Sequence, residues 1–489
     1  MLFESPLSFL VSSGLFDKTI LLAEVPIHAG TEVPGWVMGF FTVVLVLMVL
    51  ALAFEEKIHA KKSIIVGTFA GFCLITETVI SYFLGEKLVP FGMIVLPNGH
   101  EIDIPVYIPA IDWGVITIIL GASLFVEVTS KSGVFSWMAI KLTKTSGGDP
   151  WRLLIFYGLL TVGFSAVLNN VTAMIIIGSL TTVSLKKLNR NDLLLGFLLT
   201  EGLLTNVGGL LTLISSVPNI IVGKIAGISF ATFFIKAAPY VVVATAATLL
   251  LARWKFKIHA LSSEKEKAAA AELIESFDEN EGVASNRFFW FAVAVLALFI
   301  CTLAGESALP WYLNKLGMGF IALFFAGWML LAYKNQVDKF YSGMDWDLLA
   351  FFAALFVVIN VMEHALVLDL IGKGIAMVLE APQQMASSVL LASAALASSV
   401  TDNIPLSAVL AKILNSMQTE STSPYWWCVI FGSNLGGNLT PIGSASTVVA
   451  MTIINRQKLG LTFMGFVKQA FPFAAMQVVL AVFYVLLFI

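Results

Sequence analysis

The chain has 489 residues, of which 58% are hydrophobic and only 12% are charged, and its formal net charge is −3. Soluble domains carry about 25% charged residues, so this composition excludes a soluble enzyme, a disordered protein and a nucleic-acid-binding protein. Three cysteines, Cys73, Cys301 and Cys428, lie in apolar segments and predict neither a disulfide framework nor a metal cluster. We therefore expect an all-α polytopic membrane protein embedded in a lipid bilayer.

Apolar runs of about twenty residues, the length at which a helix crosses the hydrocarbon core, follow one another along the chain. We expect simple spans at residues 36–54, 63–83, 113–130, 229–251, 288–304, 317–333, 348–366 and 464–488. A helix at 133–143 is too short to span and is expected to lie on the inner surface. Four further segments carry polar residues, glycine or proline near their middle: 152–185, 194–222, 386–415 and 424–454. We expect the first and third of these to be re-entrant hairpins, and the other two to be broken helices.

The one hydrophilic stretch, at residues 253–287, separates two hydrophobic halves. It predicts an N-terminal segment (1–35), a first membrane repeat (36–252), a linker (253–287) and a second repeat (288–489). The loops beside the first hairpin and at the start of the linker are basic, which places them in the cytoplasm. We expect an integral protein of a bacterial inner membrane with a cytoplasmic linker.

Three short motifs of the first half recur in order in the second half. The first two recur after 233 residues and the third after 228: Asp112-Trp113 as Asp345-Trp346, Val167-Leu168-Asn169-Asn170 as Val400-Thr401-Asp402-Asn403, and Thr205-Asn206-Val207-Gly208-Gly209 as Ser433-Asn434-Leu435-Gly436-Gly437. Each half is expected to contain about five spans plus a hairpin. Because five is an odd number of crossings, the second copy would have the opposite orientation in the membrane. Inverted repeats with broken helices are typical of secondary transporters.

The two predicted hairpin tips carry Asn169-Asn170 and Asp402-Asn403, near the bilayer centre, where unpaired polar groups are costly. Capping of helix ends is one explanation for such residues. Their occurrence at equivalent positions, once with a carboxylate, favours a binding role. Asp402 is the one acid at either tip, and the tip sequences contain no Arg or Lys. We therefore predict that Asp402 is the main coupling carboxylate and binds a cation or a proton.

The two broken segments combine glycine pairs with polar residues: Thr205, Asn206 and Gly208 in the first, and Ser433, Asn434 and Gly436 in the second. Unwound backbone in a membrane is expected to line a cavity. Close packing of the glycines against another helix is the alternative, and the adjoining polar residues favour the cavity. Glu201, one turn before the first break, is a second candidate for proton coupling. The ends of the half-helices present both carbonyls and amides, so they do not determine whether the substrate is an anion or a cation.

Four segments, LNNVTAMIII, EGLLTNVGGLLTLISSVPNIIVG, TDNIPLSAVL and FGSNLGGNLTPIGSAS, resemble signature segments of the ion transporter superfamily. The nearest branch contains arsenite permeases, NhaD-type sodium/proton antiporters and the P protein, with a citrate-transporter-like domain. The resemblance implies a scaffold domain that forms a homodimer and a transport domain that moves as an elevator. It also implies ion-binding residues at the tips and breaks: Asn170, Thr172, Asn206, Thr212, Asp402, Asn403, Asn434 and Thr440.

The resemblance implies no cofactor other than Na+ as the coupling or transported ion. The candidate Na+ ligands are Asn170, Asn206, Asp402, Asn403 and Asn434. The chain departs from the family pattern at Asn169, where an Asp is usual, and at Ser216, where the Gly-Asp-Pro-Pro-Asn motif has its acid. Two carboxylates expected near the first tip are therefore missing.

The predicted function is secondary active transport of a small ion, with sodium/proton antiport as the first guess. Efflux of arsenite or another oxyanion, and sodium-coupled carboxylate transport, remain open. A channel or an intramembrane enzyme is a more remote alternative. We do not expect an enzyme, because the sequence has no HExxH, GxGD or GxSxG motif.

Overall fold

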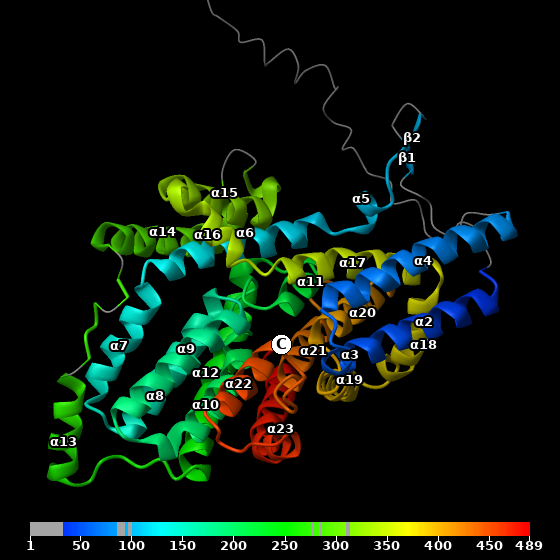
Figure 1. The fold of residues 1–489 in the computed structure, drawn as a ribbon. Coiled ribbons are helices and arrows are strands. Elements are labelled where there is room, and N and C mark those ends of the chain that lie inside the picture. The colour runs from blue at the N-terminus through cyan, green and yellow to red at the C-terminus, as the bar shows by residue number, and fades with distance from the viewer. Residues whose placement is uncertain are drawn as a thin grey trace, which may run out of the picture.

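The computed structural model describes residues 33–85, 93–95, 100–275, 277–280, 282–283, 285–309 and 313–489. Within these ranges the chain is almost entirely helical, as the composition predicts (Figure 1). The predicted N-terminal segment lies almost wholly outside the described residues.

Eight of the described helices are long and apolar enough to cross a membrane. They are α2 (Gly35–Ala53), α4 (Lys62–Leu84), α6 (Trp113–Lys131), α8 (Pro150–Val167), α12 (Phe230–Lys255), α14 (Asn286–Ala304), α17 (Trp346–His364) and α23 (Phe463–Phe488). A ninth candidate, α15 (Gly317–Ala332), bends by 91° into η4 (Lys334–Gln336) and α16 (Val337–Ser342). The predicted simple spans therefore correspond to helices within a few residues at each end.

Both predicted hairpins and both predicted breaks are present. The hairpins are α8 with α9 (Asn170–Lys187), and α19 (Gln383–Ser398) with α20 (Asn403–Ser416). The broken helices are α10 (Leu194–Gly208) with α11 (Val217–Ile225), and α21 (Pro424–Gly436) with α22 (Ala445–Arg456). Each hairpin turns at a polar residue that caps its returning helix: Asn169 accepts from the Thr172 amide at 2.7 Å, and Asp402 from the Ile404 amide at 3.0 Å.

The remaining elements are short. The short helices are α3 (Glu55–Ile58), α5 (Tyr107–Ala110), α7 (Val134–Ser146), α13 (Glu264–Glu275) and α18 (Val367–Leu379). The 3-10 turn η1 (Asn191–Leu193) lies between α9 and α10, and η2 (Glu306–Ala308) and η3 (Leu313–Leu316) lie between α14 and α15. Strands β1 (Met93–Val95) and β2 (Glu101–Asp103) pair antiparallel and were not expected from the sequence. Helix α7 confirms that residues 133–143 are helical.

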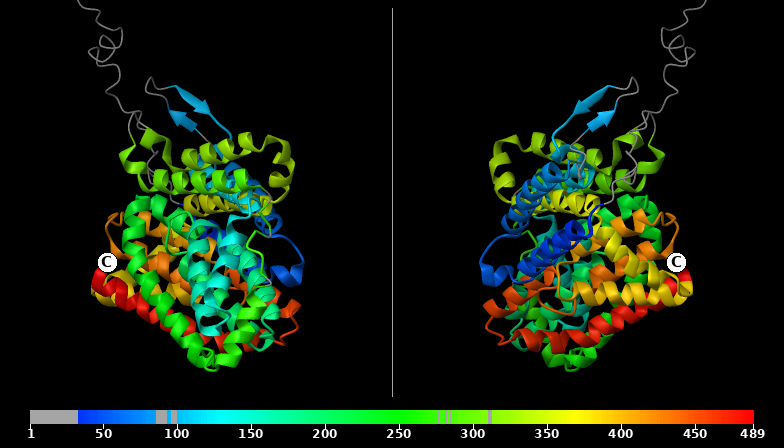
Figure 2. Two further views of the ribbon diagram at one scale, coloured as in Figure 1. Left: turned by 90° about the vertical axis from the view of Figure 1, so that its left-hand side faces the viewer. Right: turned by 90° about the vertical axis from the view of Figure 1, so that its right-hand side faces the viewer.

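The helices form two layers. The long-helix layer contains α2, α4, α6, α14, α15 and α17, and lies along one side of the molecule (Figures 1 and 2). The hairpin layer contains both hairpins, both broken helices, α12 and α23. Helix α7 joins the layers in the first half and α18 in the second. The halves are interleaved, because α4 packs on α17, α15 on α6, α10 on α22, and α11 on α20.

Two hydrogen bonds tie each break to the hairpin of its own half, and both recur at the sequence offsets of the repeat. The Ser165 hydroxyl donates to the Thr205 carbonyl at 2.6 Å, as Ser398 does to Ser433 at 2.5 Å; the Thr212 hydroxyl donates to the Ala166 carbonyl at 2.5 Å, as Thr440 does to Ser399 at 2.6 Å. These equivalent bonds support a duplicated chain. The inversion of the copies across the membrane remains a prediction.

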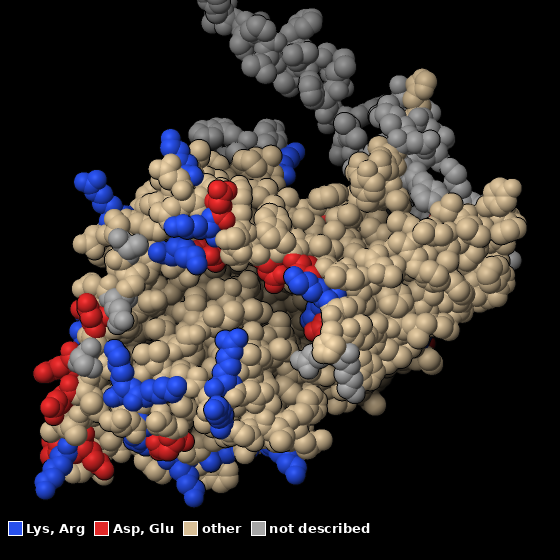
Figure 3. Space-filling view, viewed as in Figure 1, with Lys and Arg blue, Asp and Glu red and all other residues tan. Residues whose placement is uncertain are grey.

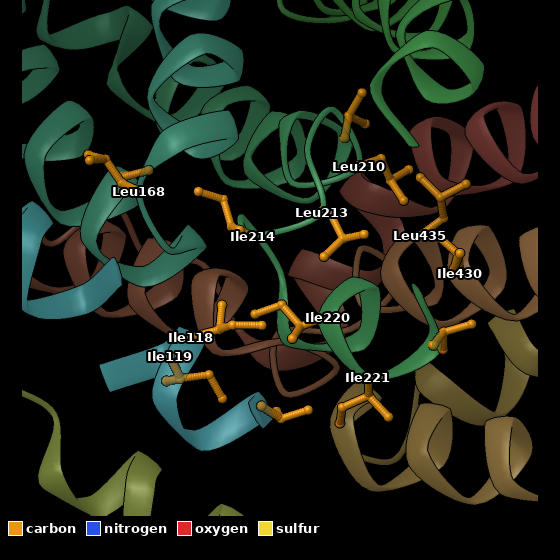
Figure 4. Packing of buried hydrophobic residues seen from close by; sticks show 14 of the residues in the cluster. Ile118, Ile119, Leu168, Leu210, Leu213, Ile214, Ile220, Ile221, Ile430 and Leu435 are labelled. Atoms are coloured by element: carbon orange, nitrogen blue, oxygen red, sulfur yellow. The ribbon is translucent and has the colours of Figure 1, made fainter. Parts of the chain in front are cut away.

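The first break is a buried loop between α10 and α11. Its apolar side chains pack against α6 and α21 (Figure 4). Its carbonyls need partners, and the Asn219 side-chain amide donates to Gly209 at 2.6 Å and to Thr212 at 3.0 Å. The unwound backbone is thus stabilised inside the protein, as a non-helical segment in a membrane requires.

Candidate functional site

A cavity of about 850 Å³ lies between the two layers, where Figure 3 shows acidic and basic side chains gathered around a hollow. The first turns of four helices line it: Asn170, Val171 and Thr172 of α9, Val217 and Pro218 of α11, Asn403 and Ile404 of α20, and Ala445 and Ser446 of α22. Charged and polar residues on the side of the long-helix layer complete it: Glu55, His59, Lys61, Lys62, Glu127, Asp345 and Asp347. The cavity therefore has walls from both halves and both layers.

The first hairpin tip and the first break meet directly at this cavity. The Asn170 side-chain amide donates to the Asn206 oxygen at 3.2 Å, and Ser446 donates to the same oxygen at 3.1 Å. Asn206 in turn donates to the Ser444 hydroxyl at 2.8 Å. Asn169, Asn170, Thr172, Asn206 and Asn403 all line the cavity, so five of the predicted site residues are brought together.

Asn434 is the counterpart of Asn206 in the second half. It does not line the cavity itself, but it contacts a residue that does. It is fully buried; its oxygen accepts from Ser216 at 2.7 Å, and its amide donates to Asn219 at 2.9 Å. Ser216 itself lines the cavity. The two breaks are thus cross-connected, because each break asparagine bonds a serine at the start of the other half's short helix.

The hydroxyl groups of the other predicted threonine and serine residues point to backbone carbonyls. Thr205 donates to Gly202 at 2.6 Å and Ser433 to Val429 at 2.7 Å, within their own helices. Thr212 and Thr440 donate to the hairpin carbonyls described above. These four residues are not among those lining the cavity, and they hold the breaks in place.

Gly208 and Gly436 are close-packing positions. A Cβ on Gly208 would lie 2.7 Å from the Val162 Cα, and one on Gly436 would lie 2.1 Å from the Ala395 carbonyl oxygen. Real Cβ atoms do not approach so closely, so glycine lets each break helix pack on its hairpin. The close-packing explanation, which the sequence made less favoured, therefore applies at both positions, and neither glycine lines the cavity.

Asp402 has a basic partner that the tip sequence does not contain. One carboxylate oxygen caps α20, and the other forms an ion pair with the Lys62 ammonium at the start of α4. The Lys62 ammonium also lies 3.8 Å from a Glu55 oxygen, and the neighbouring Ser63 hydroxyl donates to Asp347. The tip sequences contain no Arg or Lys, but the structure places the Lys62 ammonium of α4 against the second tip.

Glu201 lies apart from the cavity. Its side chain is fully buried, and one oxygen accepts from the Thr181 hydroxyl of α9 at 2.6 Å. The other oxygen has no hydrogen-bond partner among the described residues. Glu201 is therefore a protonatable group inside the hairpin layer, separate from the residues that line the cavity.

The described residues contain no group of three or more His, Cys, Asp or Glu side chains placed to hold a metal ion. Of the predicted Na+ ligands, Asn170, Asn206 and Asn403 line the cavity, whereas Asp402 and Asn434 do not. Amide oxygens are hard ligands that suit such a cation.

Several site residues were missed by sequence reasoning. Lys62 was detectable only as a base opening an apolar span, and Ser444 and Ser446 lie in a segment whose asparagines and glycines drew attention first. Asn438 lies in the second polar break segment but was not singled out as a site residue, and its partner Gln477 is a single amide in an apolar helix.

The chain is similar to several known membrane proteins. The family model described as a citrate transporter matches residues 72–432. An uncharacterized transporter of Mycobacterium tuberculosis is 28% identical over 400 residues, covering 80% of this chain and 90% of that protein. The P protein of Homo sapiens is 24% identical over 507 residues, covering 88% of this chain and 60% of the P protein.

A solved structure shares the fold. The crystal structure of the Alcanivorax borkumensis YdaH transporter matches with a TM-score of 0.56 at 14% identity, covering 87% of this chain and 98% of that one. These likenesses confirm the polytopic helical fold and the resemblance to the branch that contains the P protein. Because the family model spans most of the residues, the chain is an integral membrane protein that belongs to the citrate transporter family.

Proposed function

We propose that the chain is a secondary active transporter that carries a small carboxylate together with a cation, with citrate and Na+ as the first solutes to test. The observation that carries the proposal is the cavity between the layers, in which both hairpins and both breaks meet. Its volume of about 850 Å³ lies in the range of small-molecule sites and exceeds what a lone ion needs.

The charge around the cavity supports a paired cargo. Four helices present their N-terminal turns to it, and the partial positive charge of such turns attracts anions. Lys61 and Lys62 add positive charge, whereas Glu55 and Asp347 supply acids that would accompany a cation. An anion bound with its coupling cation satisfies both signs better than either ion alone.

An elevator movement of the hairpin layer along the long-helix layer is our proposed mechanism. The cavity lies between the layers, so such a movement would expose it to one side of the membrane and then to the other. Its test is cross-linking: a cysteine pair at Asp112 and Lys224, which form an ion pair between the start of α6 and the end of α11 on opposite layers, should arrest transport when oxidised and restore it on reduction.

The function is tested with purified protein in liposomes. An inward Na+ gradient should drive uptake of [14C]citrate, and an equal K+ gradient should not. Citrate uptake at the same rate with and without the Na+ gradient would disprove coupling to Na+. The absence of any citrate uptake would disprove citrate as a substrate.

Sodium/proton antiport, the first guess from the sequence, is the second candidate. Glu201 favours it, because a fully buried carboxyl with one unpartnered oxygen is suited to hold a proton. The same liposomes loaded with a pH-sensitive dye distinguish the two. Proton efflux driven by Na+ without citrate would favour antiport.

A further inference from the structure

A chain of buried polar side chains leads from the cavity to the interface of α12 and α23. Asn206 donates to the Asn438 oxygen at 2.8 Å, Asn438 donates to the Gln477 oxygen at 2.7 Å, and Gln477 donates to the Thr248 hydroxyl at 2.9 Å. All four side chains are fully buried. The Tyr240 hydroxyl also donates to the Gln477 backbone carbonyl at 2.9 Å, which fixes α23 against α12.

Two acceptors, the Leu203 backbone carbonyl and the Gln477 side-chain oxygen, together set the donor directions in this chain. The Leu203 backbone carbonyl can only accept, and the Asn438 side-chain amide donates to it at 3.1 Å. The second hydrogen of that amide goes to Gln477, so the Asn438 oxygen must face Asn206. The amide orientations of Asn438 and Gln477 are therefore both determined.

The consequence reaches the cavity. Because Asn206 uses its amide hydrogens on Asn438 and Ser444, its oxygen faces Asn170 and Ser446, which line the cavity. A reversed Asn206 would point two hydrogens at the Asn170 amide, which is itself a donor. The orientation of Asn206 thus fixes which groups of Asn170 and Ser446 are turned toward its oxygen at this end of the cavity.

The repeat shows that the fold does not require these polar residues. At the same offsets, the first-half counterparts of Asn438 and Gln477 are Leu210 and Ala244, and both are fully buried. Pro239 and Pro472, at the same offset of 233 inside α12 and α23, confirm the register. Buried amides are costly unless fully bonded, so an apolar pair would have sufficed for packing alone.

We propose that Gln477 and Asn438 are positioning residues that hold the Asn206 carboxamide with its oxygen toward Asn170 and Ser446, so that these cavity-lining groups are arranged to bind the transported solute or its cation. The proposal rests on the transport function proposed above and assigns a role to residues that do not touch the cargo. Gln477 acts through Asn438, and Asn438 acts through Asn206.

The test replaces Gln477 by methionine, which keeps the length of the side chain and removes its acceptor. In proteoliposomes with [14C]citrate and a Na+ gradient, Gln477→Met should raise the KM for citrate or for Na+ about five- to tenfold, because one buried hydrogen bond that orients the site is lost. The maximal rate should stay within about twofold, since the moving layers are untouched.

Two controls separate positioning from general damage. Gln477→Glu in its neutral form offers a carbonyl to Asn438 and a hydroxyl to Thr248, so it should keep the wild-type KM values. Gln384→Met makes the same change on an exposed part of α19 and should have no effect. If Gln477→Met does not fold, the smaller Gln477→Ala, which admits water, takes its place.

Unchanged KM values for citrate and Na+ in Gln477→Met would overturn the proposal, whatever happens to its melting temperature. If the wild-type protein carries neither citrate nor Na+, the function proposed above has failed, and a cryo-EM structure of Gln477→Met decides this inference instead. Loss of the contacts from Asn206 to Asn170 and Ser446 supports the positioning role. An Asn206 side chain that keeps both contacts contradicts it.

Discussion

Lys62, at the start of α4, and Asp402, at the tip of the second hairpin, form an ion pair that joins the long-helix layer to the hairpin layer. The two residues are 340 positions apart, and their side chains are 27% and 10% exposed. A charge pair at such a boundary holds the two layers in one relative position. Any displacement of the hairpin layer must break it.

We predict that the pair stabilises this arrangement measurably. Lys62→Met and Asp402→Asn should each lower the melting temperature in detergent, and the double variant should lose less than the two single losses together. A coupling energy of about 1 kcal/mol is expected for a half-shielded pair of this kind. Additive losses in this double-mutant cycle would show that the pair contributes nothing.

Asp402→Asn should also abolish ion-coupled transport while the protein still inserts. Asparagine keeps the cap on α20 but removes the charge, and it recreates the Asn-Asn tip of the first half. The measurement is Na+-driven citrate uptake, with the exposed Asp338→Asn as the matched control. Wild-type coupled uptake by Asp402→Asn would leave Asp402 with its helix cap and its ion pair to Lys62, and with no role in coupling.

Gly436→Ala should destabilise the protein by about 1–3 kcal/mol, because its methyl group would overlap the Ala395 backbone and force the break helix away from α19. Gly71→Ala is the control, since nothing lies within 4 Å of a Cβ there, and alanine favours the α4 helix. Thermal unfolding in detergent measures both. Equal melting temperatures would show that the contact at Gly436 relaxes without cost.

A cysteine placed at Lys265 should be labelled by membrane-impermeant maleimide only when the cytoplasmic face is open. The basic loops of the first half place the linker there, and α13, which contains this residue, is exposed. Labelling of intact cells or right-side-out vesicles would reverse the predicted orientation.

The spans could be predicted because a bilayer imposes both length and composition on each helix. The hairpins and breaks could be predicted because their polar residues interrupt those runs. The partner of Asp402 could not, since no periodicity tells which distant helix end meets a hairpin tip. The same limit applies to Gln477, a single amide in an apolar helix, and to the short elements β1, β2 and α16, which are too brief to leave a pattern.

The close packing at Gly208 and Gly436 shows a different limit. Glycine next to asparagine suggested backbone that lines a cavity, and the local sequence was compatible with both explanations. The structure assigns the two roles to neighbouring residues: the glycine permits the approach of two helices, and the asparagine two positions before it bonds across to the other half.

The interleaving of the two halves has a consequence for biosynthesis. Helix α4 leaves the ribosome long before α17, the helix that covers it, and α6 must likewise wait for α15. The first half can therefore enter the membrane but cannot complete its own packing, so lipid or an insertion chaperone must cover those faces in the meantime. The two halves, expressed as separate chains divided within residues 253–287, should each be degraded alone and should rescue each other when made together.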